Sequence, residues 1–210
     1  MDLDSLLSVS PVIPVVTVRD AGHALPLARA LVDGGVAIIE VTLRTPAALQ
    51  AIERIAAGVA DMTVLAGTVC SPAQVKDSLQ AGAVALVSPG LTDRLAAATA
   101  AHRAAWLPGV ATASEIIRGL ELGLHRFKLF PASVVGGQAA LRAFAGPFPE
   151  VRFCPTGGIE PGDSAAYLAL PNVSCIGGSW VATSAMVEAQ DWQGIRSNAQ
   201  RAAGLSRGGT

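Results

Sequence analysis

The sequence predicts a (β/α)8 (TIM) barrel, and three observations support this. Eight short runs rich in valine and isoleucine recur along the chain, each almost continuously apolar, as is typical of parallel strands covered on both faces. Alanine-rich stretches with capping residues separate these runs. The 210 residues, 51% hydrophobic and 15% charged, show no break in composition. One domain over residues 1–210 is therefore expected. A doubly wound open sheet is the alternative, but eight evenly spaced units favour closure.

Strands and helices alternate strictly in this prediction. Strands are expected at residues 12–18, 36–43, 62–69, 84–90, 104–110, 124–131, 150–158 and 173–180. Helices are expected at residues 20–35, 45–58, 71–82, 92–102, 112–123, 137–146, 160–170 and 184–204. Asp20 stands at a cap position, and both Thr45–Pro46 and Ser71–Pro72 combine a cap with proline at the first helical position. Pro26 is expected to bend the first helix or delay its start.

The ends of the chain and its charge bound the function. Residues 2–9 predict a short helix closing the bottom of the barrel, and residues 206–210 are expected to fray. The acidic N-terminus lacks the pattern of a signal peptide, and no apolar run approaches the roughly 18 residues needed to span a bilayer. A net charge of −1 argues against binding to nucleic acid or an anionic membrane. Three cysteines without CxxC spacing fit a reducing compartment, so a cytoplasmic location is expected.

The active site of such a barrel lies at the carboxyl ends of its strands, so the polar residues there are the candidates. Along a strand, alternate residues share a face, which places Glu40, Thr42 and Arg44 together. The same rule pairs Lys128 with Phe130. It also places Arg126 inside the barrel at a lower level, where the sequence offers no evident partner. The other candidates at strand ends are Thr68, Pro89, Thr156, Gly157, Gly158, Gly178 and Ser179.

Lys128 carries the strongest chemical signal. It is one of two lysines in the chain, and it lies in the apolar stretch "HRFKLFPAS". Burial disfavours an ammonium ion, and a neutral amine in a barrel mouth forms a Schiff base with carbonyl compounds. Glu40 is the best-placed general acid and base, and Arg44 is suited to grip a substrate carboxylate.

Two glycine-rich turns indicate a phosphate site. "TGGI" follows the seventh predicted strand and "GGSW" ends the eighth, and backbone N–H groups in these two places commonly hold phosphate in barrels of this class. Ser179 would add a hydroxyl donor. Together with the lysine, the carboxylate and the arginine, these turns predict a small phosphorylated 2-keto acid as substrate.

Other interpretations of the same residues remain open. Lys128 could reach solvent or form a structural ion pair, and Glu40 could pair with Arg44. At the level of function, the alternatives are a phosphate-binding isomerase or synthase that uses Lys128 only as a charge, and a barrel that binds a ligand without catalysis.

Several stretches resemble a known family, the bacterial 2-keto-3-deoxy-6-phosphogluconate (KDPG) and 4-hydroxy-2-oxoglutarate (KHG) aldolases. The combination of "EVTLRT", "FKLFPA" and "RFCPTGGI" is the most specific, and the matching stretches, which include "CIGGSW", span residues 11 to 180. The resemblance implies a class I aldolase of the Entner–Doudoroff pathway, a homotrimer without metal or cofactor. Such an enzyme cleaves KDPG to pyruvate and glyceraldehyde 3-phosphate.

The resemblance also implies a role for each matched residue. Lys128 would be the Schiff-base lysine, and Glu40 the acid and base that shuttles protons. Arg44 and Thr68 would hold the pyruvate carboxylate. The walls of the pyruvyl pocket would be Pro89 and Phe130, and the rest of the substrate and its phosphate would be held by Thr156, Gly157, Gly158, Gly178 and Ser179.

One departure and one ambiguity accompany the resemblance. Relatives often carry glutamate where this chain has Ser133, which follows the catalytic strand. Close relatives act on the galactonate epimer of the substrate, and those tend to carry an apolar residue at the position of Thr156. Threonine there favours the gluconate substrate.

Overall fold

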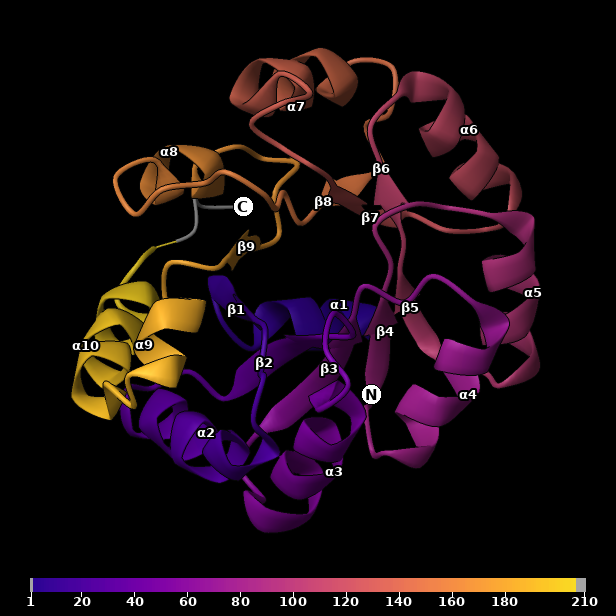
Figure 1. Cartoon of the computed structure of the whole chain (residues 1–210). Coiled ribbons are helices and arrows are strands. Elements are labelled where there is room, and N and C mark those ends of the chain that lie inside the picture. The colour runs from indigo at the N-terminus through magenta and orange to yellow at the C-terminus, as the bar shows by residue number, and fades with distance from the viewer. Residues whose placement is uncertain (1, 207–210) are drawn as a thin grey trace.

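The chain folds into a ring of parallel strands enclosed by helices, as Figure 1 shows along the barrel. The computed structural model describes residues 2–206. The strands are β1 (Val12–Val16), β2 (Ile38–Thr42), β3 (Thr63–Gly67), β4 (Ala85–Val87), β5 (Ala105–Leu107), β6 (Gly109–Val110), β7 (Arg126–Leu129), β8 (Arg152–Phe153) and β9 (Ile176–Gly178).

Two parallel sheets together close the barrel. Their strand orders are β5-β4-β3-β2-β1-β9 and β6-β7-β8. Strands β5 and β6 belong to one predicted run, interrupted at Pro108, whose missing N–H removes a donor from the ladder. On the other side, parallel bridges from Phe153 to Val173 and from Thr156 to Gly177 join the segments of β8 and β9. The predicted barrel of eight strand runs is therefore confirmed, and the open-sheet alternative is wrong.

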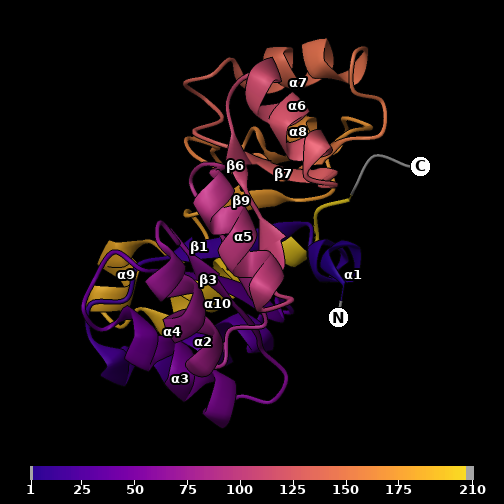
Figure 2. The same cartoon turned by 90° about the vertical axis from the view of Figure 1, so that its right-hand side faces the viewer.

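Helices surround the strands as an outer ring, and one further helix covers an end of the barrel. They are α1 (Leu3–Ser8), the 3-10 helix η1 (Ala21–His23), α2 (Ala24–Asp33), α3 (Ala48–Gly58), α4 (Pro72–Gln80), α5 (Asp93–Ala101), α6 (Ala113–Glu121), α7 (Gly137–Ala145), α8 (Ser164–Leu168), α9 (Ser184–Glu188) and α10 (Trp192–Ala203). Figures 1 and 2 agree that α1 lies apart from this ring, across one end of the barrel. None of the helices within residues 2–206 is both long enough and apolar enough to cross a membrane.

Most predicted helix starts are correct, but two details of the prediction are wrong. Ser71 caps α4 by accepting a hydrogen bond from the amide of Gln74, as predicted. Thr45 does not cap α3, because its hydroxyl donates to the carbonyl of Val18 and the helix begins only at Ala48. The helix predicted at residues 184–204 is two helices, since Gln190 between them has a positive φ of 54° that no α-helix contains.

The start of α2 follows the prediction made from Pro26. Asp20 caps the short helix η1, accepting a hydrogen bond from the amide of Gly22 at 2.7 Å. The α-helical part then starts at Ala24, so Pro26 lies in its first turn, where no intrahelical hydrogen bond is lost.

Helix α1 supplies the partner that the sequence did not reveal for Arg126. The guanidinium of Arg126 binds both carboxylate oxygens of Asp4, with 3.0 Å between Nη2 and Oδ2. Leu6 and Leu7 of α1 are buried in the core. The predicted short helix therefore closes the bottom of the barrel and neutralises the lowest charge of β7. Of residues 206–210, which are expected to fray, residues 207–210 lie outside the described residues.

The outer face of β7 packs against helices, as its alternation predicts. Phe127 is fully buried, and its ring lies 6.4 Å from that of Phe153. An added Cβ at Gly119 of α6 would lie 2.3 Å from the Phe127 ring, so glycine permits this close approach. Helix α6 thereby fixes the strand that carries Lys128 on its opposite face.

Gly34, which caps α2, provides a test of the packing between α2 and α10. An added Cβ there would lie 2.5 Å from Cβ of Ala199 and 2.7 Å from the carbonyl oxygen of Arg196. We expect Gly34→Ala to lower the free energy of unfolding by about 1–3 kcal/mol, the usual cost of overpacking. Gly146→Ala is the matched control, since Gly146 has helical backbone angles and open space around it. Equal urea midpoints for the two variants would contradict this account.

Candidate active site

A buried ion pair crosses the interior of the barrel. Nζ of Lys128 on β7 lies 2.9 Å from Oε1 and 3.2 Å from Oε2 of Glu40 on β2. Each side chain is only 5% exposed. Both side chains therefore occupy the inner face of the sheet. The alternatives in which Lys128 reaches solvent, or Glu40 pairs with Arg44, are wrong.

Two glycines lie on the inner face, on strands next to those that carry this pair. Gly67 of β3 lies beside the Glu40 carboxylate, and an added Cβ there would be 2.3 Å from Oε1. Gly109 of β6 is the register partner of Lys128, and an added Cβ there would be 2.2 Å from the carbonyl oxygen of Pro89. A side chain at Gly67 would displace the Glu40 carboxylate, and a side chain at Gly109 would displace the turn after β4.

Phe130 borders the lysine, and Pro89 lies against Gly109, the register partner of that lysine. The Phe130 ring centroid lies 5.3 Å from Nζ of Lys128, a distance at which a cation is attracted to an aromatic face. Pro89 follows β4 in a turn that Ser88 holds. The Ser88 hydroxyl donates to the carbonyl of Gly90 at 2.6 Å and accepts from the indole of Trp106 at 3.0 Å.

Arg44 and Thr68 form a second pair at the rim. Nε of Arg44 donates to Oγ1 of Thr68 at 3.1 Å. Thr68 has a positive φ of 59°, a strained conformation for a β-branched residue that the surrounding structure must impose. Arg44 is exposed, and its two Nη groups have no hydrogen-bond partner within residues 2–206. They are available for an anion such as a carboxylate.

The glycine-rich turns lie side by side on the other part of the rim. Thr156 is bridged to Gly177, and its side chain fills the space in which a Cβ of Gly177 would lie. Gly157 and Gly158 both have positive φ, 100° and 71°. Gly178 is buried within β9, and the exposed Ser179 follows it directly. These turns can present backbone N–H groups to an anion.

Ser133 contacts this same region. Its amide donates to the carbonyl of Gly157 at 3.0 Å. Its side chain lies over Gly158, because an added Cβ on that glycine would be 2.0 Å from Ser133 Oγ. Ser133 therefore supports the glycine-rich turn.

Sequence reasoning overlooked the first strand. Val15 is the register partner of Glu40 and is partly exposed, and Thr17 lies two residues further towards the rim. The alternation used for β2 and β7 would have placed both side chains on the inner face.

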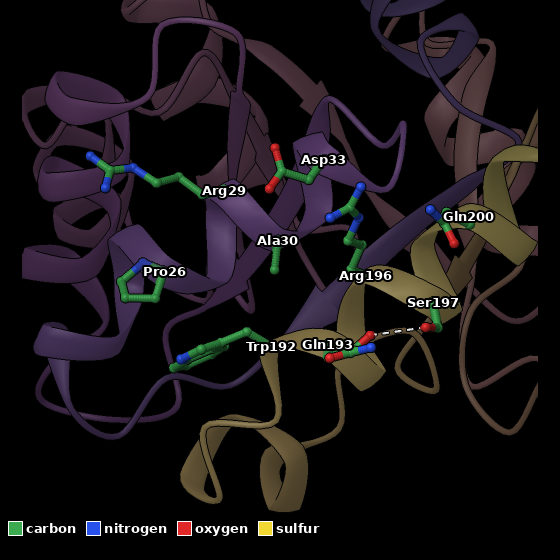
Figure 3. A pocket seen from close by; sticks show the side chains of 9 residues that line it. All are labelled: Pro26, Arg29, Ala30, Asp33, Trp192, Gln193, Arg196, Ser197 and Gln200. Carbon is green, nitrogen blue, oxygen red and sulfur yellow. Dashed lines mark hydrogen bonds between the residues drawn. The ribbon is translucent and has the colours of Figure 1, made fainter.

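Two other features lie outside this arrangement. No three or more His, Cys, Asp or Glu side chains of residues 2–206 gather closely enough to hold a metal ion. A groove of about 630 Å³ runs between α2 and α10 on the outside of the barrel, and Figure 3 shows its lining residues, among them Arg29, Asp33, Trp192 and Arg196. None of the residues that surround Lys128 contributes to it.

Comparison with known proteins points to one family. The family model described as KDPG and KHG aldolase matches residues 3–198. The KHG/KDPG aldolase of Escherichia coli (strain K12) is 48% identical over 199 residues, which are 95% of this chain and 93% of that protein.

Solved structures give the same result. The 2-keto-3-deoxy-6-phosphogluconate aldolase from Zymomonas mobilis has a TM-score of 0.94 at 44% identity, covering 99% of this chain and 98% of that one. The KDPG aldolase from Legionella pneumophila, with pyruvate captured at low pH as a covalent carbinolamine intermediate, also has a TM-score of 0.94, at 41% identity over 97% and 98% of the two chains. The chain belongs to the KDPG and KHG aldolase family.

Proposed function

We propose that this protein is a class I aldolase, a carbon–carbon lyase that cleaves KDPG to pyruvate and glyceraldehyde 3-phosphate through a Schiff base on Lys128. We also propose that it cleaves 4-hydroxy-2-oxoglutarate to pyruvate and glyoxylate. The observation that carries the proposal is the buried contact of 2.9 Å between Lys128 Nζ and Glu40 Oε1. The names of the relatives support both substrates, and pyruvate bound covalently in the Legionella pneumophila enzyme supports the chemistry.

The first step forms the covalent bond. Transfer of a proton from Lys128 to Glu40 leaves a neutral amine, which is the nucleophilic form. The amine attacks the C2 carbonyl of the substrate and gives a carbinolamine. Glu40 then returns a proton to the departing hydroxyl, and loss of water gives the protonated imine.

The second step breaks the bond between C3 and C4. Glu40 accepts the proton of the C4 hydroxyl, directly or through a water molecule, and the aldehyde carbonyl forms as the bond breaks. The bonding electrons flow into the protonated imine and give an enamine. Protonation of C3 by Glu40 and addition of water then release pyruvate and the free lysine. The short contact between the two side chains suits this exchange of protons, since general acid–base catalysis requires hydrogen-bond reach.

The rest of the rim would hold the two anionic ends of the substrate. Arg44, fixed by Thr68, would bind the carboxylate with its free Nη groups. Phe130 and Pro89 would form the walls beside the pyruvyl group. The phosphate and the sugar chain would be held by Thr156, Gly157, Gly158, Gly178 and Ser179.

Membership of the family supports three further statements. We infer that the protein assembles as a homotrimer in the cytoplasm and acts in the Entner–Doudoroff pathway. The three cysteines form no disulfide, which suits a reducing compartment and supports the location.

The competing functions make different predictions. A phosphate-binding isomerase or synthase would use Lys128 only as a charge, and the ion pair by itself is compatible with that role. A barrel that only binds its ligand would keep its affinity for pyruvate after Lys128→Met. Trapping of the imine therefore separates the aldolase from both alternatives.

Borohydride reduction in the presence of pyruvate should label Lys128. The reduced adduct adds the mass of pyruvic acid less one oxygen atom, and mass spectrometry should find it on the tryptic peptide 127–142, since an alkylated lysine resists trypsin. Lys76, which lies in the exposed part of α4, is the internal control and should stay unlabelled. Lys128→Arg should be inactive and unlabelled, because guanidinium forms no imine. Absence of label in the wild type would rule out the imine mechanism.

Substitution of Glu40 should slow catalysis far more than it affects folding. We expect Glu40→Gln to lower kcat by about a hundredfold or more, the scale of a positioned acid and base. A rate near that of the wild type would remove Glu40 from this role.

Gly67→Ala tests the same carboxylate without changing its chemistry. The added methyl group would occupy the space of the Glu40 Oε1 atom, so kcat should fall although Glu40 is still present. Gly146→Ala, which has open space around it, is the control and should retain full activity.

A coupled assay should rank the substrates. We expect KDPG to be cleaved with higher kcat/KM than its galactonate epimer, since Thr156 occupies the position at which galactonate-specific relatives tend to carry an apolar residue. Slower cleavage of KDPG than of the epimer would reverse the assignment. The same assay with 4-hydroxy-2-oxoglutarate measures the second proposed activity.

A further inference from the structure

Strand β1 contributes an inner face that the proposed mechanism does not use. Its register with β2 pairs Val15 with Glu40 and Val16 with Val41, so the next pair is Thr17 with Thr42. Thr42 shares the inner face with Glu40, because the two residues are separated by one position. Thr17 lies 2.9 Å from Thr42, Oγ1 to Oγ1, which places its side chain on the inner face as well.

The burial of β1 agrees with this orientation. Val12, Pro14, Val16 and Val18 are buried, whereas Val15 and Thr17 remain partly exposed. Residues of a strand become exposed on the inside of a barrel only near its open end. Thr17 therefore lines the mouth, above Val15 and the Glu40 carboxylate.

The hydrogen bonds fix the polarity of the Thr17 hydroxyl. Thr42 has one hydroxyl proton, which it donates to the carbonyl of Val16 at 3.0 Å. Thr17 must then be the donor in its contact with Thr42, because a hydrogen bond between two hydroxyls needs one proton. The oxygen of Thr17 retains its lone pairs, and no donor within residues 2–206 binds them. It offers the substrate an acceptor and no proton.

The position of β1 identifies the part of the substrate that reaches it. Strand β1 lies between β2 and β9 in the sheet. The proposed carboxylate site is at the ends of β2 and β3, with Arg44 and Thr68. The proposed phosphate site is at the ends of β8 and β9, next to Gly158 and Ser179. A substrate held at both ends must pass the end of β1 with its middle carbons.

We propose that Thr17 is a specificity residue that accepts a hydrogen bond from the C5 hydroxyl of the substrate, the hydroxyl next to the phosphate-bearing carbon. This inference rests on the proposed aldolase function. With this contact the site distinguishes an aldehyde that carries the hydroxyl from one that lacks it. The C5 hydroxyl donates its proton to the Thr17 oxygen, and the Thr17 proton is already bound to Thr42.

The test compares two aldehydes in the direction of synthesis. Glyceraldehyde 3-phosphate carries the hydroxyl that becomes that of C5, and 3-oxopropyl phosphate has hydrogen in its place. The C4 hydroxyl arises from both aldehydes, so a contact with C4 would not alter their ratio. The measured ratio is kcat/KM for glyceraldehyde 3-phosphate divided by kcat/KM for 3-oxopropyl phosphate. We expect Thr17→Val to lower this ratio by about two- to tenfold, the value of one neutral hydrogen bond. Thr17→Ser, which keeps the hydroxyl, should keep the ratio.

The outcomes separate this inference from the proposed function. An unchanged ratio in Thr17→Val, or an equal loss with both aldehydes, would overturn the role of Thr17. Labelling of Lys128 by pyruvate and borohydride should remain as in the wild type, because pyruvate lacks the carbon in question. If the wild type itself shows no labelling and no aldol product, the aldolase function has failed and not the assignment of Thr17 alone.

Discussion

The ion pair between Lys128 and Glu40 is the constraint on which the inner architecture depends. Each charge has left water, and an unpaired charge in such a place costs several kcal/mol, so each side chain must find the other. The partners are 88 residues apart in sequence and stand on β2 and β7, which the barrel brings face to face. Gly67 leaves room for the Glu40 carboxylate, and Gly109 leaves room for the turn that holds Pro89. The opposite face of β7 is fixed by Phe127 against α6. Closure of the ring is therefore a condition for tolerating the two charges.

The energetics of a buried ion pair bear on the role of Lys128 and Glu40. Well-packed apolar side chains in place of a buried ion pair are often neutral or stabilising. The pair is thus poorly explained as a device for stability. It is better explained by a reaction that needs an amine and a carboxylate within one hydrogen bond, since each proposed step moves a proton to or from Glu40. The second ion pair of β7, between Arg126 and the exposed Asp4, shows the contrast. It joins β7 to α1 at the closed end, where no substrate enters, and its role is architectural.

Sequence periodicity predicted the features that depend on neighbours along the chain. Alternation along β7 placed Lys128 on the inner face and Phe127 on the outer face, and the cap at Ser71 needed only local chemistry. Features set by distant segments were missed. The partner of Arg126 is 122 residues away in sequence. Thr45 does not cap α3, because its hydroxyl donates to the carbonyl of Val18, just beyond β1. The break at Gln190 depends on one backbone angle that the alanine-rich pattern does not encode. Thr17 was missed although the rule applied to it, because a threonine in an apolar strand gives no signal until its hydrogen bonds are known.

The hydrogen bonds of the hydroxyl groups around the mouth determine which groups can bind a ligand. Backbone carbonyl groups at and just beyond the ends of the strands accept hydrogen bonds from side-chain hydroxyls. The hydroxyls that donate to such carbonyls are those of Thr42, Thr45, Ser88 and Thr156. Those protons are used within the protein, as is that of Thr17, whose oxygen remains as an acceptor. Hydrogen-bond donation to a ligand therefore falls to Arg44, to Lys128, to Ser179 and to the backbone of the glycine-rich turns. A rim divided in this way binds anions at its two donor regions and hydroxyl groups between them. A chain of hydroxylated carbons with a carboxylate at one end and a phosphate at the other matches that division.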